Sequence, residues 1–206
     1  MGGEGLKIMS DKKAAVLIDN YYLKKEVLDH RRGNSGEFKL DYEKFSEKLC
    51  EKLNSERYRT YVYDCDVGSN ENFLKILERL PLFELRKGEI QRTDHSIRQK
   101  QVDIYLAVDM IKLASKNRVE NIILVTGDTD FIPAIKYVKD EGAMVTLFTA
   151  KKDSFRELSA TCDRTYALDD EFLIEYRANF SHETGNRKED YQKKYYRKEY
   201  QNRRNY

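Results

Sequence analysis

Three features that would each indicate a definite class of protein are missing from this sequence. No apolar run exceeds five residues, whereas a helix needs ~20 apolar residues to cross a bilayer, and the N-terminus lacks the apolar segment of a signal peptide. The cysteines, Cys50, Cys65 and Cys162, form no CxxC pair and no Cys/His cluster, which argues against a zinc site. We therefore expect a cytoplasmic protein with reduced thiols and no membrane partner.

Charge is unevenly distributed along the chain. The 206 residues carry a net charge of +2, but residues 185–206 hold eight Lys and Arg against three Asp and Glu, so this tail is +5 and the remainder is −3. The hydrophobic fraction of 40%, with 15 Tyr and 9 Phe, is enough for a core. We predict a flexible segment at 1–12, one domain at 13–178, and a disordered, basic, Tyr-rich tail at 179–206 that has no aliphatic residues to bury.

Segments with the spacing of strands and helices alternate through the middle of the chain. Strands are expected at 14–19, 58–63, 83–91, 121–126, 143–149 and 165–168, and helices at 21–28, 41–53, 72–80, 99–116, 131–141, 153–160 and 169–177. Residues 83–91 mix apolar and charged side chains, which indicates an edge strand, and Gly142 stands where a helix C-cap belongs. The alternation predicts an α/β fold with a mostly parallel sheet flanked by helices.

The most informative feature is that two apolar strands end in aspartates. The run 122–125 is followed by a Thr-Gly turn and then by Asp128 and Asp130, and the strand at 14–18 ends in Asp19. Open α/β sheets bind their ligands at the carboxyl ends of their strands. We therefore expect one acidic pocket. Two carboxylates ~4 Å apart repel by about 4 kcal/mol at an effective dielectric near 20, so such a pocket needs a bound cation.

A third acidic segment lies at the start of the helix expected at 99–116. Asp103 and Asp109 are six residues apart, which is ~9 Å of rise and roughly 240° of rotation, so the two side chains do not reach the same ion. Asp103 is nearer the helix start and is the expected metal ligand. Asp109 is expected to support the turn at Thr126 or to be an ordinary acid on the helix face.

These acids also have plainer interpretations. An Asp after a strand is often the N-cap of the next helix. Asp128 fits either role, and Asp130, the residue before the helix expected at 131–141, is the more natural N-cap. No histidine is needed for the chemistry, because all three histidines lie in charged segments outside the acidic motifs: His30, His95 and His182.

Together these segments resemble the NYN domain family, in particular its LabA-like members, which are a branch of the PIN-like nuclease superfamily. The matching residues are Val16–Asn20, Lys100–Asp103 with Leu106 and Asp109, Val125–Phe131, and the stretch Leu158–Asp163. The resemblance covers residues 14–177. It implies a three-layer α/β/α sandwich with a mostly parallel central sheet, and hydrolysis of RNA phosphodiester bonds with Mg²⁺ or Mn²⁺ as cofactor.

The resemblance also implies roles for individual residues. The metal ligands and catalytic residues would be Asp19, Asp103, Asp128 and, directly or through water, Asp130. Residues supporting these ligands or the scissile phosphate would be Asn20, Asp109 and Thr126. The held ion would activate a water molecule for attack on a backbone phosphate. The sequence departs from the family at Tyr21 and Tyr22, where the family often has smaller residues, and this departure leaves the substrate class open.

The expected partner is single-stranded RNA, which requires cations along its path. Near the presumed strand ends these are Lys24, Lys25, Arg31, Arg32, Arg92, Arg98 and Lys100. In the tail they are Lys193, Lys194 and Arg197, interleaved with tyrosines. This pattern suits single strands, because bases stack on rings while cations contact phosphates. The alternative for the tail is a solvated charged segment without a ligand.

The sequence leaves three functions open. The first is a metal-dependent endoribonuclease, and the second is a catalytically weak RNA-binding or protein-interaction scaffold of the same fold. The third is a haloacid-dehalogenase-type phosphatase, because Asp128-Thr129-Asp130 after a strand matches the nucleophile motif of that class. That motif usually lies early in a chain and has Thr or Val where this sequence has Ile132. A homodimer is expected by analogy alone.

Overall fold

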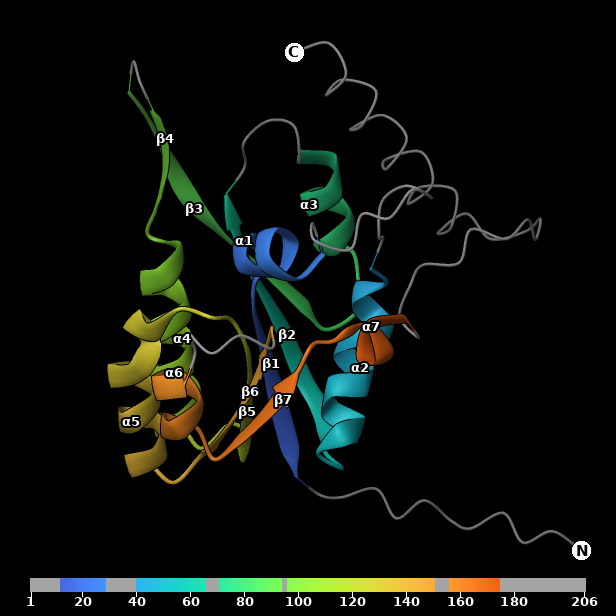
Figure 1. Ribbon diagram of the computed structural model, residues 1–206, viewed down its shortest axis with the longest axis vertical. Helices are drawn as coiled ribbons and strands as arrows, with labels where there is room; N and C mark the ends of the chain where they lie inside the picture. Colours follow the sequence, from blue (N-terminus) through green and yellow to red (C-terminus); the bar gives the residue numbers. More distant parts are fainter. Residues whose placement is uncertain (1–11, 29–39, 66–70, 94–95, 151–155, 175–206) are drawn as a thin grey trace, which may run out of the picture.

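The strand at the centre of the fold is β1 (Lys13–Asp19), of which every residue but the first is buried. The computed structural model describes residues 12–28, 40–65, 71–93, 96–150 and 156–174. Six parallel strands form the main sheet (Figure 1), in the spatial order β3 (Phe83–Thr93), β2 (Glu56–Cys65), β1, β5 (Asn121–Val125), β6 (Met144–Thr149) and β7 (Arg164–Ala167). The sequence-based prediction of a mostly parallel sheet is confirmed.

Helices cover both faces of this sheet and make the molecule a three-layer α/β/α sandwich. Val16 and Ile18 of β1 belong to the apolar cluster on one face, and Ala15 and Leu17 belong to the cluster on the other, as the alternation of a strand requires. The first face is covered by α1 (Asn20–Tyr22), a π-helix (Leu23–Leu28), α2 (Tyr42–Lys52), α3 (Glu71–Leu77) and α7 (Asp170–Ile174). The second is covered by α4 (Val102–Ser115), α5 (Ile132–Asp140) and α6 (Arg156–Thr161).

One strand was not predicted. Residues Ser96–Lys100 form β4, which pairs antiparallel with residues 89–93 of β3. Gln101 then adopts a left-handed conformation with φ 75°, and α4 begins at Val102 rather than at residue 99. The predicted edge strand at 83–91 therefore pairs with the parallel sheet only over residues 83–88. Its second half continues into a hairpin that extends beyond the end of β2 (Figure 1).

The remaining predicted elements are present with shifted ends. The helix expected at 21–28 is a short α-turn followed by a π-helix, and the one expected at 72–80 ends at Leu77. Gly142 has φ 89° just after α5, as predicted for a helix C-terminus. The proposed segments at 1–12 and 179–206 lie almost wholly outside the described residues. Among the helices that are described, none is both long enough and apolar enough to span a bilayer.

Candidate active site

Asp19 and the turn after β5 meet at the carboxyl edge of the sheet. Ile18 is in register with Val125, so Asp19 and Thr126 are the next residues on two adjacent strands. The Thr126 hydroxyl donates a hydrogen bond to Asp19 Oδ2 at 3.1 Å. The Tyr22 backbone N–H donates to Asp19 Oδ1 at 3.0 Å, so the carboxylate also caps α1. Both oxygens of a carboxylate that is only 8% exposed are thereby fixed in place.

The first turn of α4 brings a second carboxylate toward this edge. Burial raises the pKa of Asp19 to about 6, and repulsion from Asp103 and Asp128 adds to the increase against the opposing effect of its two hydrogen bonds. The Asp103 side chain reaches solvent. Its pKa is nevertheless raised, first by partial burial and then by the charges of Asp128 and Asp130. The charges of Asp103, Asp128 and Asp130 thus raise the pKa of Asp19 or of Asp103, as charges gathered in one region do.

Asp128, not Asp130, caps the turn that leads into α5. Its Oδ1 accepts the backbone N–H of Asp130 at 2.9 Å, and a 3₁₀ turn at Thr129–Phe131 separates the cap from α5. The prediction that Asp130 is the N-cap is therefore wrong, because this extra turn moves the cap two residues toward the N-terminus. In the described part of the chain, the exposed Asp130 carboxylate accepts no hydrogen bond.

Thr126 connects the two strand ends. Its hydroxyl accepts the Asp128 backbone N–H at 3.2 Å while donating to Asp19. The Thr126 side chain is completely buried. This single hydroxyl therefore fixes the position of the Asp128 backbone relative to the Asp19 carboxylate.

Asn20 faces away from these acids. Its amide Nδ2 donates to Asp64 Oδ2, and its Oδ1 accepts the Tyr42 hydroxyl. Asp64 also accepts a hydrogen bond from Lys24 Nζ at 3.1 Å. Both ends of the buried amide are engaged within the protein, so the structure gives Asn20 an anchoring role for α1 in place of the predicted contact with ligands or phosphate.

The role of Asp64 was missed from the sequence. It lies near the end of β2, where an acid after an apolar run was a detectable signal. Tyr63 is in register with Asp19, so Asp64 projects from the opposite face of the sheet. It therefore does not join the acidic group, which consists of Asp19, Asp103, Asp128 and Asp130. Its ion pair also corrects the prediction for Lys24, whose ammonium group is directed to Asp64 and lies 4.5 Å from the centre of the Phe73 ring.

Asp109 also lies elsewhere than predicted. It accepts hydrogen bonds from the Tyr63 hydroxyl at 3.1 Å and from Arg86 Nε at 2.9 Å, and it makes no contact with the turn at Thr126 among the described hydrogen bonds. The rotation of the helix between Asp103 and Asp109 explains this, since it turns Asp109 toward β2 and β3. Burial, followed by the Asp109 charge, raises the pKa of Tyr63 well above its usual value.

The Asp109–Arg86 pair predicts a specific loss of stability. Asp109→Asn should lower the free energy of unfolding by about 1–2 kcal/mol, because it weakens a partly buried ion pair whose arginine is one-third exposed to solvent. Urea denaturation followed by circular dichroism would measure this. The matched control is Glu84→Gln, which removes the other, more exposed carboxylate near Arg86 and should cost less than about 0.5 kcal/mol. Equal losses would contradict a special role for Asp109.

The remaining predicted cations are only partly described. Lys25 is exposed. Arg92 lies on β3 and Arg98 and Lys100 lie on β4, in the hairpin that extends past the carboxyl edge of the sheet (Figure 1). Outside the described residues are the other predicted contacts and the three histidines: Arg31, Arg32, Lys193, Lys194, Arg197, His30, His95 and His182.

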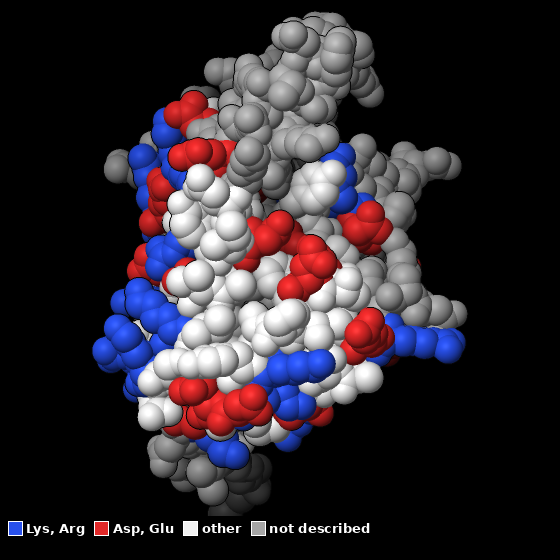
Figure 2. Space-filling model, turned by 90° about the vertical axis from the view of Figure 1, so that its left-hand side faces the viewer, with Lys and Arg blue, Asp and Glu red and all other residues white. Residues whose placement is uncertain are grey.

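The carboxylates have the oxygen donors that Mg²⁺ and Mn²⁺ prefer. Within the described residues, however, no three Asp, Glu, His or Cys side chains are close enough together to form a ready-made metal site. Binding of one ion by Asp19, Asp103 and Asp128 together therefore requires their side chains to move closer. The face that carries α4 and α5 shows a central group of acidic side chains bordered by uncharged surface, with Lys and Arg at its left-hand margin and, mixed with Asp and Glu, in its lower part (Figure 2).

Comparisons with known proteins agree with this architecture. The crystal structure of a protein of unknown function from Vibrio parahaemolyticus superposes with a TM-score of 0.57 at 24% identity, over 80% of this chain and 98% of that one. At this identity the likeness shows the fold alone. An uncharacterized protein of Methanocaldococcus jannaschii is 31% identical over 74 residues, which are 36% of this chain and 31% of that protein. The match thus spans less than a third of that relative.

A family model supplies the assignment. The model of the NYN domain matches residues 13–169, which include every element from β1 to β7 and all four aspartates of the acidic group. This range agrees with the resemblance seen in the sequence at 14–177. NYN domains belong to the PIN-like superfamily, whose members are generally nucleases that use divalent metals. The chain is a member of the NYN domain family.

Proposed function

We propose that this protein is a metal-dependent ribonuclease that hydrolyses phosphodiester bonds in single-stranded RNA. The observation that carries the proposal is that separate segments of the chain bring acids to one edge of the sheet, where the Thr126 hydroxyl links Asp19 to the Asp128 backbone. The neighbouring acids also raise the pKa of Asp19 and of Asp103. Carboxylates gathered in this way destabilise a protein unless something positive binds among them. The family match supports nuclease chemistry as the use of that site.

In this proposal Asp19, Asp103 and Asp128 hold Mg²⁺ or Mn²⁺, and Asp130 assists directly or through water. When bound, the ion would lower the pKa of a water ligand and stabilise charge on the phosphate oxygens. The other contributions come from the chain itself. Thr126 and the Tyr22 N–H hold the Asp19 oxygens in a fixed orientation, and burial places the Asp19 carboxylate in surroundings where charges interact strongly.

Thr126 provides a graded test of this arrangement. Thr126→Val keeps the shape of the side chain but removes the hydroxyl between Asp19 and Asp128. We expect ~10–100-fold slower cleavage, the usual effect of losing a group that orients a metal ligand, and a matching increase in the Mn²⁺ concentration needed for half-maximal activity. Thr126→Ser, which retains the hydroxyl, should recover most of the activity. Equal activity of Val and Ser variants would refute the orienting role.

Metal and substrate dependence test the proposal as a whole. A labelled single-stranded RNA should be cut in the presence of Mn²⁺ or Mg²⁺, and chelation by EDTA should stop the reaction. Single-stranded DNA and duplex RNA of the same sequence serve as comparison substrates. Cleavage that persists in EDTA would contradict the proposal, whereas RNA binding without metal-dependent cleavage would favour the alternative, an RNA-binding scaffold of the same fold.

The haloacid-dehalogenase-type phosphatase receives no support from these findings. The chain is an NYN domain over residues 13–169. The Asp128 carboxylate is already engaged as a helix cap through Oδ1. Covalent labelling of Asp128 by a phosphate analogue would instead support a phosphatase with Asp128 as its nucleophile. The expected cytoplasmic location and the homodimer stay predictions.

A further inference from the structure

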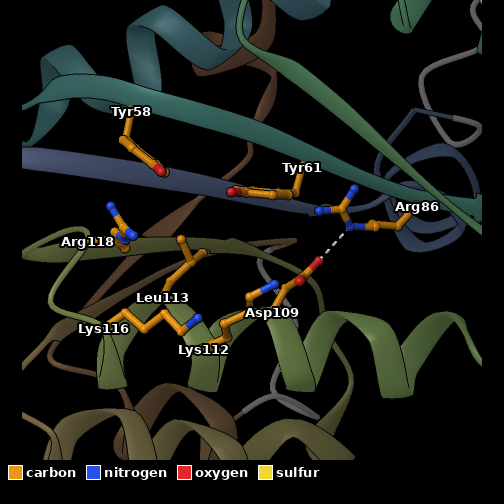
Figure 3. Close-up of a pocket in the computed structure, with 8 residues that line it drawn as sticks. All are labelled: Tyr58, Tyr61, Arg86, Asp109, Lys112, Leu113, Lys116 and Arg118. Atoms are coloured by element: carbon orange, nitrogen blue, oxygen red, sulfur yellow. Dashed lines mark hydrogen bonds and ion pairs between the residues drawn. The ribbon is translucent and has the colours of Figure 1, made fainter.

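A second charged site lies on the flank of α4, apart from the acidic group. A pocket of about 270 Å³ is lined by residues from β2, β3, α4 and the segment after α4: Tyr58, Tyr61, Arg86, Asp109, Lys112, Leu113, Lys116 and Arg118 (Figure 3). Four of these are cations and one is a carboxylate. The sequence did not suggest this pocket, because its residues come from three separate segments of the chain.

The positive charge in this pocket is largely uncompensated. Asp109 is engaged by Arg86 at 2.9 Å, and Arg86 also lies 5.3 Å from the centre of the Tyr61 ring. Lys112, Lys116 and Arg118 are exposed, and no ion pair holds any of them within the described part of the chain. In Figure 3 these three side chains lie across the pocket from Tyr58 and Tyr61. Three unpaired cations around one hollow are suited to binding a polyanion.

The pocket begins close to the level of the acidic group in the sheet. Arg86 is in register with Tyr63, and Tyr63 is in register with Asp19, so Arg86 lies two strands, roughly 10 Å, from Asp19. Along α4, Lys112 follows Asp103 by nine residues, which is about 13 Å of helix rise. The cations therefore extend from the level of Asp19 toward the opposite edge of the sheet.

We propose that this pocket binds the backbone and a base of single-stranded RNA on one side of the cleaved bond. Lys112, Lys116 and Arg118 contact phosphates, and the half-buried ring of Tyr58 offers a surface on which a base stacks. The proposal rests on the proposed function for the identity of the strand and for the presence of a cleaved bond. The combination of tyrosine rings with unpaired cations on one hollow is what favours a nucleic acid strand as its occupant.

The test is binding rather than cleavage. Fluorescence anisotropy would measure the affinity of the full chain in EDTA for a labelled single-stranded RNA of about 12 nucleotides, a length within the range that single-strand-binding OB folds cover. The variant Lys112→Ala/Lys116→Ala/Arg118→Ala should bind at least about tenfold more weakly, and its slope of log affinity against log salt should be smaller by about 2, as expected for three lost phosphate contacts on a single strand.

Two further variants make this result specific. The control variant Arg79→Ala/Lys136→Ala/Arg164→Ala makes the same change in net charge at three exposed positions, which lie after α3, on α5 and on β7, respectively. It should bind the RNA as the wild type does. Lys112→Arg/Lys116→Arg/Arg118→Lys retains the charge and should also retain binding. Unchanged binding by the pocket variant, or an equal loss in the Arg79 variant, would overturn the proposal.

The outcome is separable from that of the proposed function. If the pocket variant loses binding but the wild type cuts no RNA with Mn²⁺, the pocket stands as a nucleic-acid site and the nuclease proposal fails. If the wild type cuts RNA while the pocket variant binds and cuts equally well, the nuclease proposal stands and the pocket proposal fails.

Discussion

Asp19→Asn and Asp128→Asn should each reduce metal-dependent RNA cleavage by at least ~100-fold, more than the ~10–100-fold that is usual for residues that only orient metal ligands. Asparagine has nearly the same shape and can still accept the backbone hydrogen bonds that Tyr22 gives to Asp19 and Asp130 gives to Asp128. What it lacks is the charge. A large loss of activity with an intact fold would therefore assign the effect to the charge that holds the cation.

The matched control for these variants is Asp140→Asn, because Asp140 is an exposed acid at the end of α5 and carries the same charge. It should cleave at the wild-type rate. Initial rates in saturating Mn²⁺, together with melting temperatures for every variant, would provide the comparison. Comparable residual activity in Asp19→Asn, Asp128→Asn and Asp140→Asn would contradict the proposed active site and favour the scaffold alternative.

The second large expected effect concerns stability: Asp19→Asn, which should lose activity, should make the metal-free protein more stable. Because the pKa of Asp19 is raised from 3.8 to about 6, the folded state favours the protonated carboxyl. The stability associated with Asp19 is fully present below pH ~4 and is lost as the pH rises through about 6. In metal-free protein at pH 7.5, Asp19→Asn should therefore be more stable than the wild type, by about 1–3 kcal/mol.

Urea denaturation in EDTA at several pH values would measure this difference. The stability advantage of Asp19→Asn should shrink as the pH falls from 7.5 to 4, where the carboxyl of the folded wild type is already protonated, and should vanish near pH ~3, where it is protonated in both states. Adding Mn²⁺ at pH 7.5 should stabilise the wild type more than the variant, because a cation that binds only the folded state adds to its stability. A difference that is constant between pH 4 and 7.5 would show that Asp19 does not carry a raised pKa.

These two effects bear on the scaffold alternative. A protein that does not use its acidic group would gain stability from losing the charge at Asp19, and nothing would offset the repulsion among the four aspartates. In the proposed function, a bound cation offsets this repulsion. Two of the four acids have an evident structural role, because Asp19 and Asp128 each cap a helical turn.

The sequence was sufficient to predict which acids lie at the ends of strands. An apolar strand that ends in an acid identified both Asp19 and Asp128, because chain direction alone places the ends of parallel strands at one edge of a sheet. The six-residue spacing on α4 separated Asp103 from Asp109 correctly. The order of the acidic segments carried the resemblance to the NYN family, and the family match confirmed that assignment.

The errors came from contacts between distant segments. Residues 96–100 contain no strong strand pattern, and they become β4 through pairing with β3 and the left-handed turn at Gln101. Asp109 is directed to Arg86, and Lys24 to Asp64, across elements that are far apart in sequence. Such ion pairs depend on which helix lies against which strand, and local spacing carries no information about that.

The most direct test of the central claim is a crystal of the full chain soaked in Mn²⁺ and measured at the manganese absorption edge. The account predicts one anomalous peak within coordination distance of oxygens from Asp19, Asp103 and Asp128, with these side chains drawn closer together than they are without metal. No peak at this edge of the sheet, or a peak bound by other residues while the three carboxylates stay apart, would contradict it.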